Sequence, residues 1–460
     1  MTRRELLTLT AGLLAGATGA AAAEPAAKPN IVFILADDLG YGNVGCYGQR
    51  KIKTPHIDRL AAEGMRFTDA YAGATVCAPS RCALMTGLHT GHGRTRGNMY
   101  PDLPLRPQDI TVTELLKSAG YRTGLFGKWS LGNIGTTGHP PRKGFDEWFG
   151  FFNQNHAHTY YPDALVDNDT LHMLPANMGT PHEYAPDVIL ERGLAFLRKP
   201  DPKPMFVQFA FTIPHANNEL GRDTGNGMEV PSTEPYSAES WPAPDKNFAA
   251  MVTRLDTAVG RIVETLRGAG KAANTLIIFT SDNGPHSEGG HNPDFFDDNG
   301  PLRGIKRDLY EGGIRVPFIA SWPGRIQAGS VNSHPIAFWD FLPTACEIGG
   351  ARTPPKLDGL SFLPTLTNQP GQRDHQYFYW EFHERRFSQA VRLGFWKGVR
   401  SYPGQPLQLF DLKTDLGETR DVAATHPDVA ARIEKILAAA RTESPEWPVG
   451  GAANRSSKGK

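Results

Sequence analysis

The stretch IVFILADDLG, residues 31–40, decides the fold of this chain. Its first six residues are all apolar, which is typical of a β-strand buried on both faces, and the run ends abruptly at Asp37 and Asp38. Three further segments end near polar residues: the apolar runs 276–280, before Ser281, Asp282 and Asn283, and 205–211, before Pro214 and His215, and the less apolar segment 121–126, before Gly127 and Lys128. Each run predicts a buried strand with polar side chains at its carboxyl end.

Helical patterns separate these runs, over residues 57–63, 110–118, 187–196 and 248–268. Strands that alternate with helices predict an α/β fold with a mostly parallel sheet flanked by helices. Such a sheet binds ligands at the carboxyl ends of its strands. A single acidic pair after a strand is usually a turn or a helix cap. Acidic pairs on two strands, with a lysine and a histidine on two others, favour a functional site.

The sequence changes character near residues 367–371. Short aromatic strands are predicted at 377–382, 389–393, 395–400 and 408–412, followed by an amphipathic helix from about Pro427. This pattern predicts a smaller antiparallel sheet packed on a helix. We therefore expect a main domain over 28–366, a C-terminal α+β subdomain over 373–445 and a disordered tail over 450–460.

Composition excludes several classes of protein. The 460 residues carry 48 Lys plus Arg and 48 Asp plus Glu, so the formal net charge is zero. A neutral chain has no overall attraction for nucleic acid, and no nucleic-acid partner is expected. Four cysteines in a chain of this length do not form a disulfide scaffold.

The first residues have the order of an export signal. Arg3 and Arg4 precede a weakly apolar run that ends in small residues before Glu24. The pattern predicts a twin-arginine-like signal peptide over 1–23, with a single membrane anchor as the alternative. A cleaved signal places the mature protein in the periplasm or outside the cell, without stable membrane insertion.

The segment CAPSRCALMTG, residues 77–87, predicts a short helix that begins near Cys77. Pro79 suits the first turn of this helix and Gly87 suits its end. The helix dipole and Arg81 would favour negative charge on the sulfur, so the residues permit an activated thiolate. A buried structural cysteine beside a capped helix is the alternative.

This segment resembles the first signature of the sulfatase family, Cys-x-Pro-Ser-Arg-x-x-Leu-x-Thr-Gly, at every defined position. Further family-like segments follow in the family's order: GYRT at 120–123 leading to GKW at 127–129, ADDLGYG at 36–42, SDNG at 281–284 and PLRGIK at 301–306. The resemblance spans about residues 28–440. It implies an alkaline phosphatase-like fold with a large mixed, mostly parallel sheet, and removal of sulfate from a glycan or small sulfate ester.

The resemblance also implies a modified nucleophile. In this family the signature cysteine, here Cys77, is oxidised to Cα-formylglycine by a formylglycine-generating enzyme. One hydroxyl of the hydrated aldehyde attacks sulfur, and the other then expels sulfate. Asp37, Asp38, Asp282 and Asn283 offer the hard oxygen ligands that suit Ca²⁺, with Mg²⁺ as the alternative, and residue 77 completes the metal site.

Four further side chains take roles from the resemblance. Arg81, Lys128 and Lys306 would hold the nucleophile and the sulfate oxygens. His215 matches the family histidine that contacts sulfate or protonates the leaving oxygen.

One position departs from the family. The second signature usually reads Gly-Lys-Trp-His, whereas Ser130 stands at the histidine position here. A serine hydroxyl forms hydrogen bonds but does not titrate near neutral pH. Candidate substitutes or substrate contacts are Gln154, His156, His158, His286 and, with its neighbour Glu384, His383.

Two other functions remain open from the sequence. A related class with the same nucleophile cleaves phosphate or phosphonate esters. The non-enzyme alternative is a secreted glycan-binding protein that has lost activity, for which Ser130 is the best support.

Overall fold

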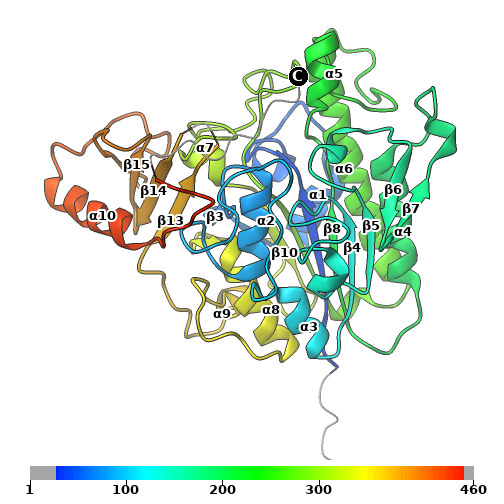
Figure 1. Cartoon of the computed structure of the whole chain (residues 1–460), viewed down its shortest axis with the longest axis horizontal. Helices are drawn as coiled ribbons and strands as arrows, with labels where there is room; N and C mark the ends of the chain where they lie inside the picture. Colours follow the sequence, from blue (N-terminus) through cyan, green and yellow to red (C-terminus); the bar gives the residue numbers. More distant parts are fainter. Residues whose placement is uncertain (1–26, 385, 450–460) are drawn as a thin grey trace, which may run out of the picture.

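The computed structural model describes residues 27–384 and 386–449. The predicted export signal and the predicted disordered tail lie outside the described residues. The chain forms a large α/β unit with a smaller sheet at one side (Figure 1).

A ten-stranded sheet forms the centre of the large unit, in the order β11-β2-β10-β9-β1-β8-β4-β5-β6-β7. Its strands are β1 (Asn30–Ala36), β2 (Met65–Phe67), β4 (Arg122–Gly127), β5 (Glu147–Gly150), β6 (Ala164–Asp167), β7 (Thr170–Met173), β8 (Met205–Ala210), β9 (Thr275–Ser281), β10 (Phe318–Ser321) and β11 (Ser330–Asn332). The five strands β9, β1, β8, β4 and β5 run parallel. Strands β10, β6 and β7 pair antiparallel towards the two edges, so the predicted mixed, mostly parallel sheet is confirmed.

Helices cover both faces of this sheet. The helices of the large unit are α1 (Pro55–Ala62), α2 (Cys77–Thr86), α3 (Val112–Ser118), α4 (Ala185–Arg198), α5 (Asn218–Thr224), α6 (Ala243–Gly268), α7 (Glu311–Ile314), α8 (Phe341–Gly349) and α9 (Leu363–Leu366). Val32 and Ile34 of β1 belong to the core with α1, α4 and α6. Ile31 and Phe33 belong to the core with α2, α3 and α8. Alternate side chains of one strand therefore enter two apolar layers, which explains the unbroken apolar run in the sequence.

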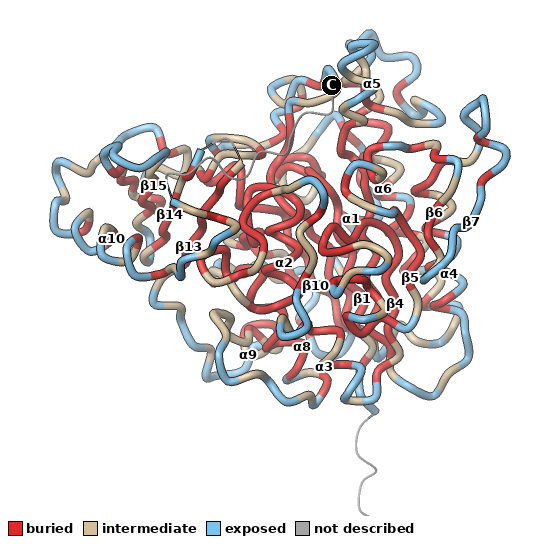
Figure 2. Tube along the Cα trace, in the orientation of Figure 1, coloured by how far each residue is buried: buried red, intermediate tan, exposed pale blue. Residues whose placement is uncertain are grey.

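Burial follows this layering (Figure 2), with buried residues continuous through the central strands and α2 and exposed residues along β7. All ten residues of α2 are buried. The helix that carries Cys77 is therefore held inside the protein.

The C-terminal part forms a four-stranded antiparallel sheet. Its strands are β13 (Phe378–Phe382), β14 (Ser388–Leu393), β15 (Trp396–Arg400) and β16 (Gln408–Asp411). Gly394, in the left-handed region at φ 61°, makes the turn between β14 and β15, as the sequence predicts. Val429, Ile433 and Leu437 of α10 (Pro427–Ala439) pack on this sheet. A two-stranded sheet of β3 (Ala70–Tyr71) and β12 (Ile336–Ala337) completes the strands.

Three helices begin earlier than their sequence patterns predict. α1 starts at Pro55 instead of 57, α4 at Ala185 instead of 187, and α6 at Ala243 instead of 248. Each has a proline in its first turn, where a missing N–H costs no hydrogen bond. Proline therefore marks the helix start there.

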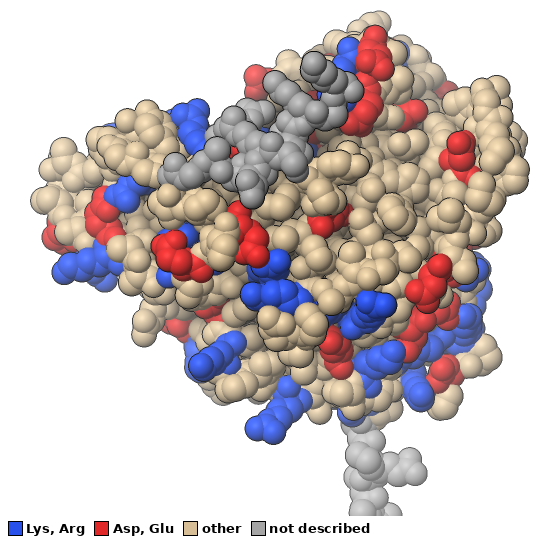
Figure 3. All heavy atoms as spheres, viewed as in Figure 1, with Lys and Arg blue, Asp and Glu red and all other residues tan. Residues whose placement is uncertain are grey.

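Among the described residues, no helix has the length and apolar character needed to cross a membrane. The face drawn in Figure 3 carries acidic and basic side chains side by side, without a large area of one sign. This distribution agrees with the zero formal charge of the sequence.

Candidate active site

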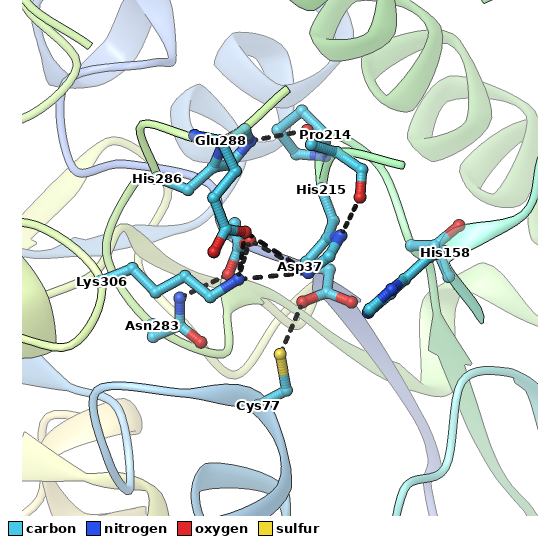
Figure 4. A network of polar contacts seen from close by, with 12 residues as sticks. Asp37, Cys77, His158, Pro214, His215, Asn283, His286, Glu288 and Lys306 are labelled. Atoms are coloured by element: carbon cyan, nitrogen blue, oxygen red, sulfur yellow. Dashed lines mark hydrogen bonds and ion pairs between the residues drawn. The ribbon is translucent and has the colours of Figure 1, made fainter. Parts of the chain in front are cut away.

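The polar residues predicted at the strand ends meet at one edge of the sheet (Figure 4). β1 delivers Asp37 and Asp38, and β9 delivers Asp282 and Asn283, from neighbouring parallel strands. Lys128 follows β4, His215 follows the end of β8, and Cys77 begins α2. All of these side chains are buried. The site therefore combines side chains from five elements that are far apart in the sequence.

Cys77 lies directly against the acidic pair. Its Sγ donates to Asp37 Oδ1 at 3.2 Å. Burial, reinforced by the negative charge of Asp37, raises the pKa of the thiol well above its ordinary value. An unmodified Cys77 is therefore a neutral thiol, and the expectation of a thiolate activated by the helix end is wrong. The helix dipole favours the thiolate, but its effect on the pKa of the thiol is smaller than the opposing effect of burial beside carboxylates.

Two cations neutralise the inner side of the site. Lys128 Nζ donates to Asp37 Oδ2 at 2.6 Å, and Arg81 donates through Nε and Nη2 to Asp282 Oδ2 at 3.0 and 2.7 Å. Arg81 Nη1 also donates to the carbonyl oxygen of Lys128 at 2.7 Å. Burial alone would raise the pKa of Asp37, but Lys128, His215 and Arg81 together lower it. Asp37 is therefore ionised across the physiological range.

Lys306 joins the other carboxylate to the histidine. Its Nζ lies 2.8 Å from Asp38 Oδ2, 2.9 Å from Glu288 Oε2 and 3.1 Å from His215 Nε2. Burial lowers the pKa of this lysine, but the two carboxylates raise it further, so Lys306 is charged. His215 Nδ1 donates to the carbonyl oxygen of Ala216 at 2.6 Å, so its Nε2 is the acceptor for Lys306. Burial and the charge of Lys306 hold the pKa of His215 well below its ordinary value, and the imidazole is neutral.

The acidic cluster fits a divalent cation. Asn283 Nδ2 donates to Asp38 Oδ1 at 2.7 Å, whereas the buried Asn283 Oδ1 has no hydrogen-bond partner among the described residues. A buried oxygen without a partner costs free energy unless a donor or a cation faces it. Burial and the charge of Asp37 raise the pKa of Asp282 to about 7. A bound cation would give the Asn283 oxygen a partner and would offset the repulsion between Asp37 and Asp282. Oxygen ligands of this type suit Ca²⁺ or Mg²⁺.

The serine that replaces the family histidine is held by a side chain from the next loop. Ser130 takes a left-handed backbone conformation, with φ 66°, and its Oγ donates to Gln154 Oε1. The backbone N–H of Gln154 in turn donates to Asp102 Oδ2 at 3.1 Å. Burial raises the pKa of Asp102 to about 6. Asp102 was not predicted from the sequence, because it lies in a loop without a motif.

The structure separates the three histidines that could substitute at Ser130. His156 Nδ1 accepts from the backbone N–H of Phe152 at 2.9 Å, away from the cluster. His286 uses both ring nitrogens, since Nε2 donates to the carbonyl oxygen of Pro214 and Nδ1 accepts from the N–H of Glu288.

His158 is arranged differently. Its Nδ1 donates to Glu219 Oε2 at 3.1 Å, and its ring stacks on His215 with 4.8 Å between centroids. Figure 4 shows the ring pointing inwards beside His215 and Asp37. No described residue forms a hydrogen bond with His158 Nε2. Glu219, on α5, is a partner that the sequence did not suggest.

His383 lies in a separate network. Its Nε2 donates to Glu381 Oε1 at 3.0 Å, and its ring packs near Trp447. Its neighbour Glu384 does approach the site edge, because it accepts from Arg307 Nε at 3.1 Å. Arg307 also donates to Glu288 at 2.6 Å. Glu288 and Arg307 are polar residues of the site edge that sequence reasoning missed.

Comparisons with known proteins agree with this geometry. A family model described as Sulfatase matches residues 29–351, and one described as N-sulphoglucosamine sulphohydrolase, C-terminal, matches residues 304–443. The chain is 34% identical to arylsulfatase A of Homo sapiens over 92% of this chain and 89% of the relative. It is 33% identical to N-acetylgalactosamine-6-sulfatase of Canis lupus familiaris, over 85% of this chain and 76% of the relative.

The fold comparison gives the same result. The solved structure of Ps i-CgsB in complex with k-i-k-neocarrahexaose superposes with a TM-score of 0.79 at 29% identity, covering 92% of this chain and 95% of that chain. The match extends over both sheets of the protein. The chain therefore belongs to the sulfatase family and is a sulfuric ester hydrolase.

Proposed function

We propose that the protein hydrolyses a sulfate ester through a formylglycine derived from Cys77 and a divalent cation, Ca²⁺ or Mg²⁺ with Ca²⁺ favoured. The cation would be held by Asp37, Asp38, Asp282 and Asn283 together with residue 77. The observation that carries this proposal is the 3.2 Å contact between Cys77 Sγ and Asp37 Oδ1 inside a ring of buried cations. When present, the hydrated aldehyde supplies a nucleophilic hydroxyl and the cation supplies a Lewis acid beside it.

The cationic side chains of this chain divide the remaining work. Lys128 and Arg81 lie on the side of Cys77 and Asp37, where they would hold the nucleophile and stabilise negative charge. Lys306 carries its proton at Nζ, and the neutral His215 Nε2 accepts one of its hydrogen bonds. We therefore assign the proton for the leaving oxygen to Lys306 and the orientation of that lysine to His215.

His158 is the residue that we propose in place of the family histidine at Ser130. Glu219 holds its Nδ1–H, so its Nε2 is free to exchange a proton with the reacting groups. Ser130 and Gln154 would then contact the substrate through hydrogen bonds without titrating. His286 is excluded as a proton carrier because backbone hydrogen bonds hold both of its ring nitrogens. His156 is set aside because no hydrogen bond joins it to the acidic cluster among the described residues.

The substrate that we propose is a sulfated glycan or a small sulfate ester. The relatives named N-acetylgalactosamine-6-sulfatase and the structure with a bound neocarrahexaose support a sugar substrate. Maturation would require a formylglycine-generating enzyme. The predicted export signal supports a periplasmic or secreted location.

The proposed reaction is tested by comparing pure protein on 4-nitrophenyl sulfate and 4-nitrophenyl phosphate. We expect a higher kcat/KM for the sulfate, and no turnover of either by the Cys77→Ala variant. A higher kcat/KM for the phosphate would favour the phosphate or phosphonate alternative. Absence of turnover in protein that carries the aldehyde and Ca²⁺ would favour the glycan-binding alternative.

A further inference from the structure

A cavity of about 620 Å³ opens beside Lys306, between the main unit and the C-terminal sheet. The main unit contributes residues of two segments, and the C-terminal sheet contributes the ends of β13, β14 and β15. The lining is His286, Ser287, Glu288, Ile305, Lys306, Arg307, Asp308, Leu309, Tyr310, Phe382, Arg386, Ser388, Val399, Ser401 and Tyr402. Because Lys306 and Glu288 belong to both the cavity and the active site, the two are continuous.

The cations of this cavity differ in how they are neutralised. Lys306 is paired with Asp38 and Glu288, and Arg307 with Glu288 and Glu384. Arg386 is exposed, and no carboxylate among the described residues pairs with it. Its guanidinium lies over the ring of Tyr402, 5.3 Å from the centroid. The cavity thus presents one cation whose charge is available to a ligand.

The backbone at Arg307 supports a defined cavity wall. Arg307 has φ 79°, in the left-handed region that a non-glycine residue rarely adopts. The carboxylates of Glu288, in the main unit, and Glu384, just after β13, both accept hydrogen bonds from its side chain. This bridge joins the main unit to the C-terminal sheet and keeps the wall beside Arg386 in place.

The rest of the lining suits a sugar better than a lipid. The hydroxyls of Ser287, Ser388 and Ser401 form no hydrogen bond with any described residue, so they are open to ligand hydroxyls. Tyr402 is 36% exposed and offers an aromatic face. Apolar lining residues are few, and Phe382 among them is only 3% exposed. A sterol or lipid would need a largely apolar wall.

We propose that this cavity binds the sugar next to the sulfated one and that Arg386 binds a second acidic group, a carboxylate or a sulfate, on that sugar. The inference rests on the proposed function, since it takes Lys306 as the point where the scissile ester lies. Tyr402 stacks on the sugar ring and the serine hydroxyls bind its hydroxyls. Arginine suits this role because its planar fork matches carboxylate and sulfate oxygens.

The test measures binding and turnover separately. Binding is measured by calorimetry on the Cys77→Ala variant with Ca²⁺, using a chondroitin 6-sulfate tetrasaccharide as the probe. We expect Arg386→Gln, in the same background, to weaken binding about tenfold, which corresponds to about 1.4 kcal/mol.

The matched control is Arg373→Gln, a substitution of an exposed arginine outside the cavity, which should leave affinity unchanged. In otherwise wild-type protein, Arg386→Gln should leave kcat/KM for 4-nitrophenyl sulfate within about twofold, because this small ester does not reach Arg386.

A carboxyl-reduced tetrasaccharide identifies the acidic group. If the Arg386 effect disappears with this probe, the group is the carboxylate of the neighbouring uronic acid. If it persists, Arg386 binds a sulfate on the sugar beyond and no acidic group of the neighbouring sugar, which contradicts the inference. Equal affinity of the Arg386 variant and its parent for the native tetrasaccharide, or no measurable binding by the parent, contradicts the inference. Hydrolysis of 4-nitrophenyl sulfate does not need the cavity. Failure of the proposed function would therefore appear as absent turnover of this ester, whereas failure of the inference about the cavity would appear in the calorimetry.

Discussion

Cys77 Sγ and Asp37 Oδ1 lie 3.2 Å apart, which joins the first residue of α2 to the carboxyl end of β1. Lys128 fixes the other oxygen of the same carboxylate at 2.6 Å. A group formed at position 77 therefore lies beside a proposed metal ligand and a buried cation. This single relationship brings the proposed nucleophile, the proposed cation site and a charge-stabilising lysine into one volume.

The choice of cysteine gives the first prediction. Cys77→Ala should abolish turnover of 4-nitrophenyl sulfate, because no other described side chain can take the position that Cys77 Sγ occupies beside Asp37 Oδ1. Cys82→Ala is the control, since Cys82 lies one turn later on α2 and packs in the core. It should keep most of the activity and lose about 1 kcal/mol of stability. Equal loss of activity in the two variants would show that Cys77 is not the nucleophile.

The acidic cluster predicts that cation binding stabilises the protein. Removal of the ion with EDTA should lower both activity and Tm, because Asp37, Asp38 and Asp282 then repel one another, and added Ca²⁺ should restore both. Asn283→Ala should weaken Ca²⁺ affinity at least tenfold in calorimetry. The substitution removes Asn283 Oδ1, a buried oxygen that has no hydrogen-bond partner among the described residues and would bind the cation. Asn247→Ala, on α6, is the control. Unchanged Tm and Ca²⁺ affinity in Asn283→Ala would remove this residue from the ligand set.

His158 should exchange the proton that Ser130 cannot exchange. The His158→Gln side chain can still form hydrogen bonds but cannot exchange a proton. We expect kcat to fall about 10²-fold and the pH profile of kcat to lose one limb. The charged and titratable groups that face this ring are Glu219, His215 and Asp102.

Two variants separate the role of His158 from general disturbance of its surroundings. His156→Gln, two residues away, should change kcat less than twofold. Glu219→Gln should shift the same limb of the pH profile, because the partner of His158 Nδ1 would lose its charge. If His158→Gln lowers kcat with an unchanged pH profile, the residue has only a structural role.

Asp256 predicts a pH dependence of stability. This side chain of α6 is 1% exposed and accepts from the backbone N–H of Ile57 at 2.7 Å, and burial raises its pKa to about 7. The unfolded chain ionises near 3.8, so the folded form loses relative stability as pH rises from about 4 through 7. Asp256→Asn keeps the acceptor without the charge. The variant should gain about 1–4 kcal/mol over the wild type between pH 4 and pH 8 in urea unfolding. A constant difference across this range would contradict the raised pKa.

The strands β1 and β9 were predictable because each is almost entirely apolar over residues 31–36 and 276–279. Burial on both faces favours apolar residues on both sides of these strands, so the two runs are visible in the sequence alone. The polar edge was predictable for a related reason, since parallel strands deliver their carboxyl ends to one line. Edge strands such as β7, whose residues are all exposed, carry no such pattern and were not predicted.

The protonation states in the site were not predictable from sequence. The helix position of Cys77 suggested an activated thiolate, but the tertiary structure surrounds the sulfur with burial and Asp37. Likewise, the sequence left His156, His158 and His286 as equal candidates. Only the backbone hydrogen bonds of two of them, and the carboxylate partner of the third, distinguish them. These contacts join loops that are distant in the chain, and no local motif encodes them.

Peptide mass spectrometry across residue 77, on active protein purified from its native host, decides whether this residue is the modified nucleophile. We expect the peptide that contains position 77 to carry the aldehyde, and the fraction of aldehyde to rise in proportion to specific activity between preparations. Fully active protein in which this peptide contains only the cysteine thiol would contradict this expectation.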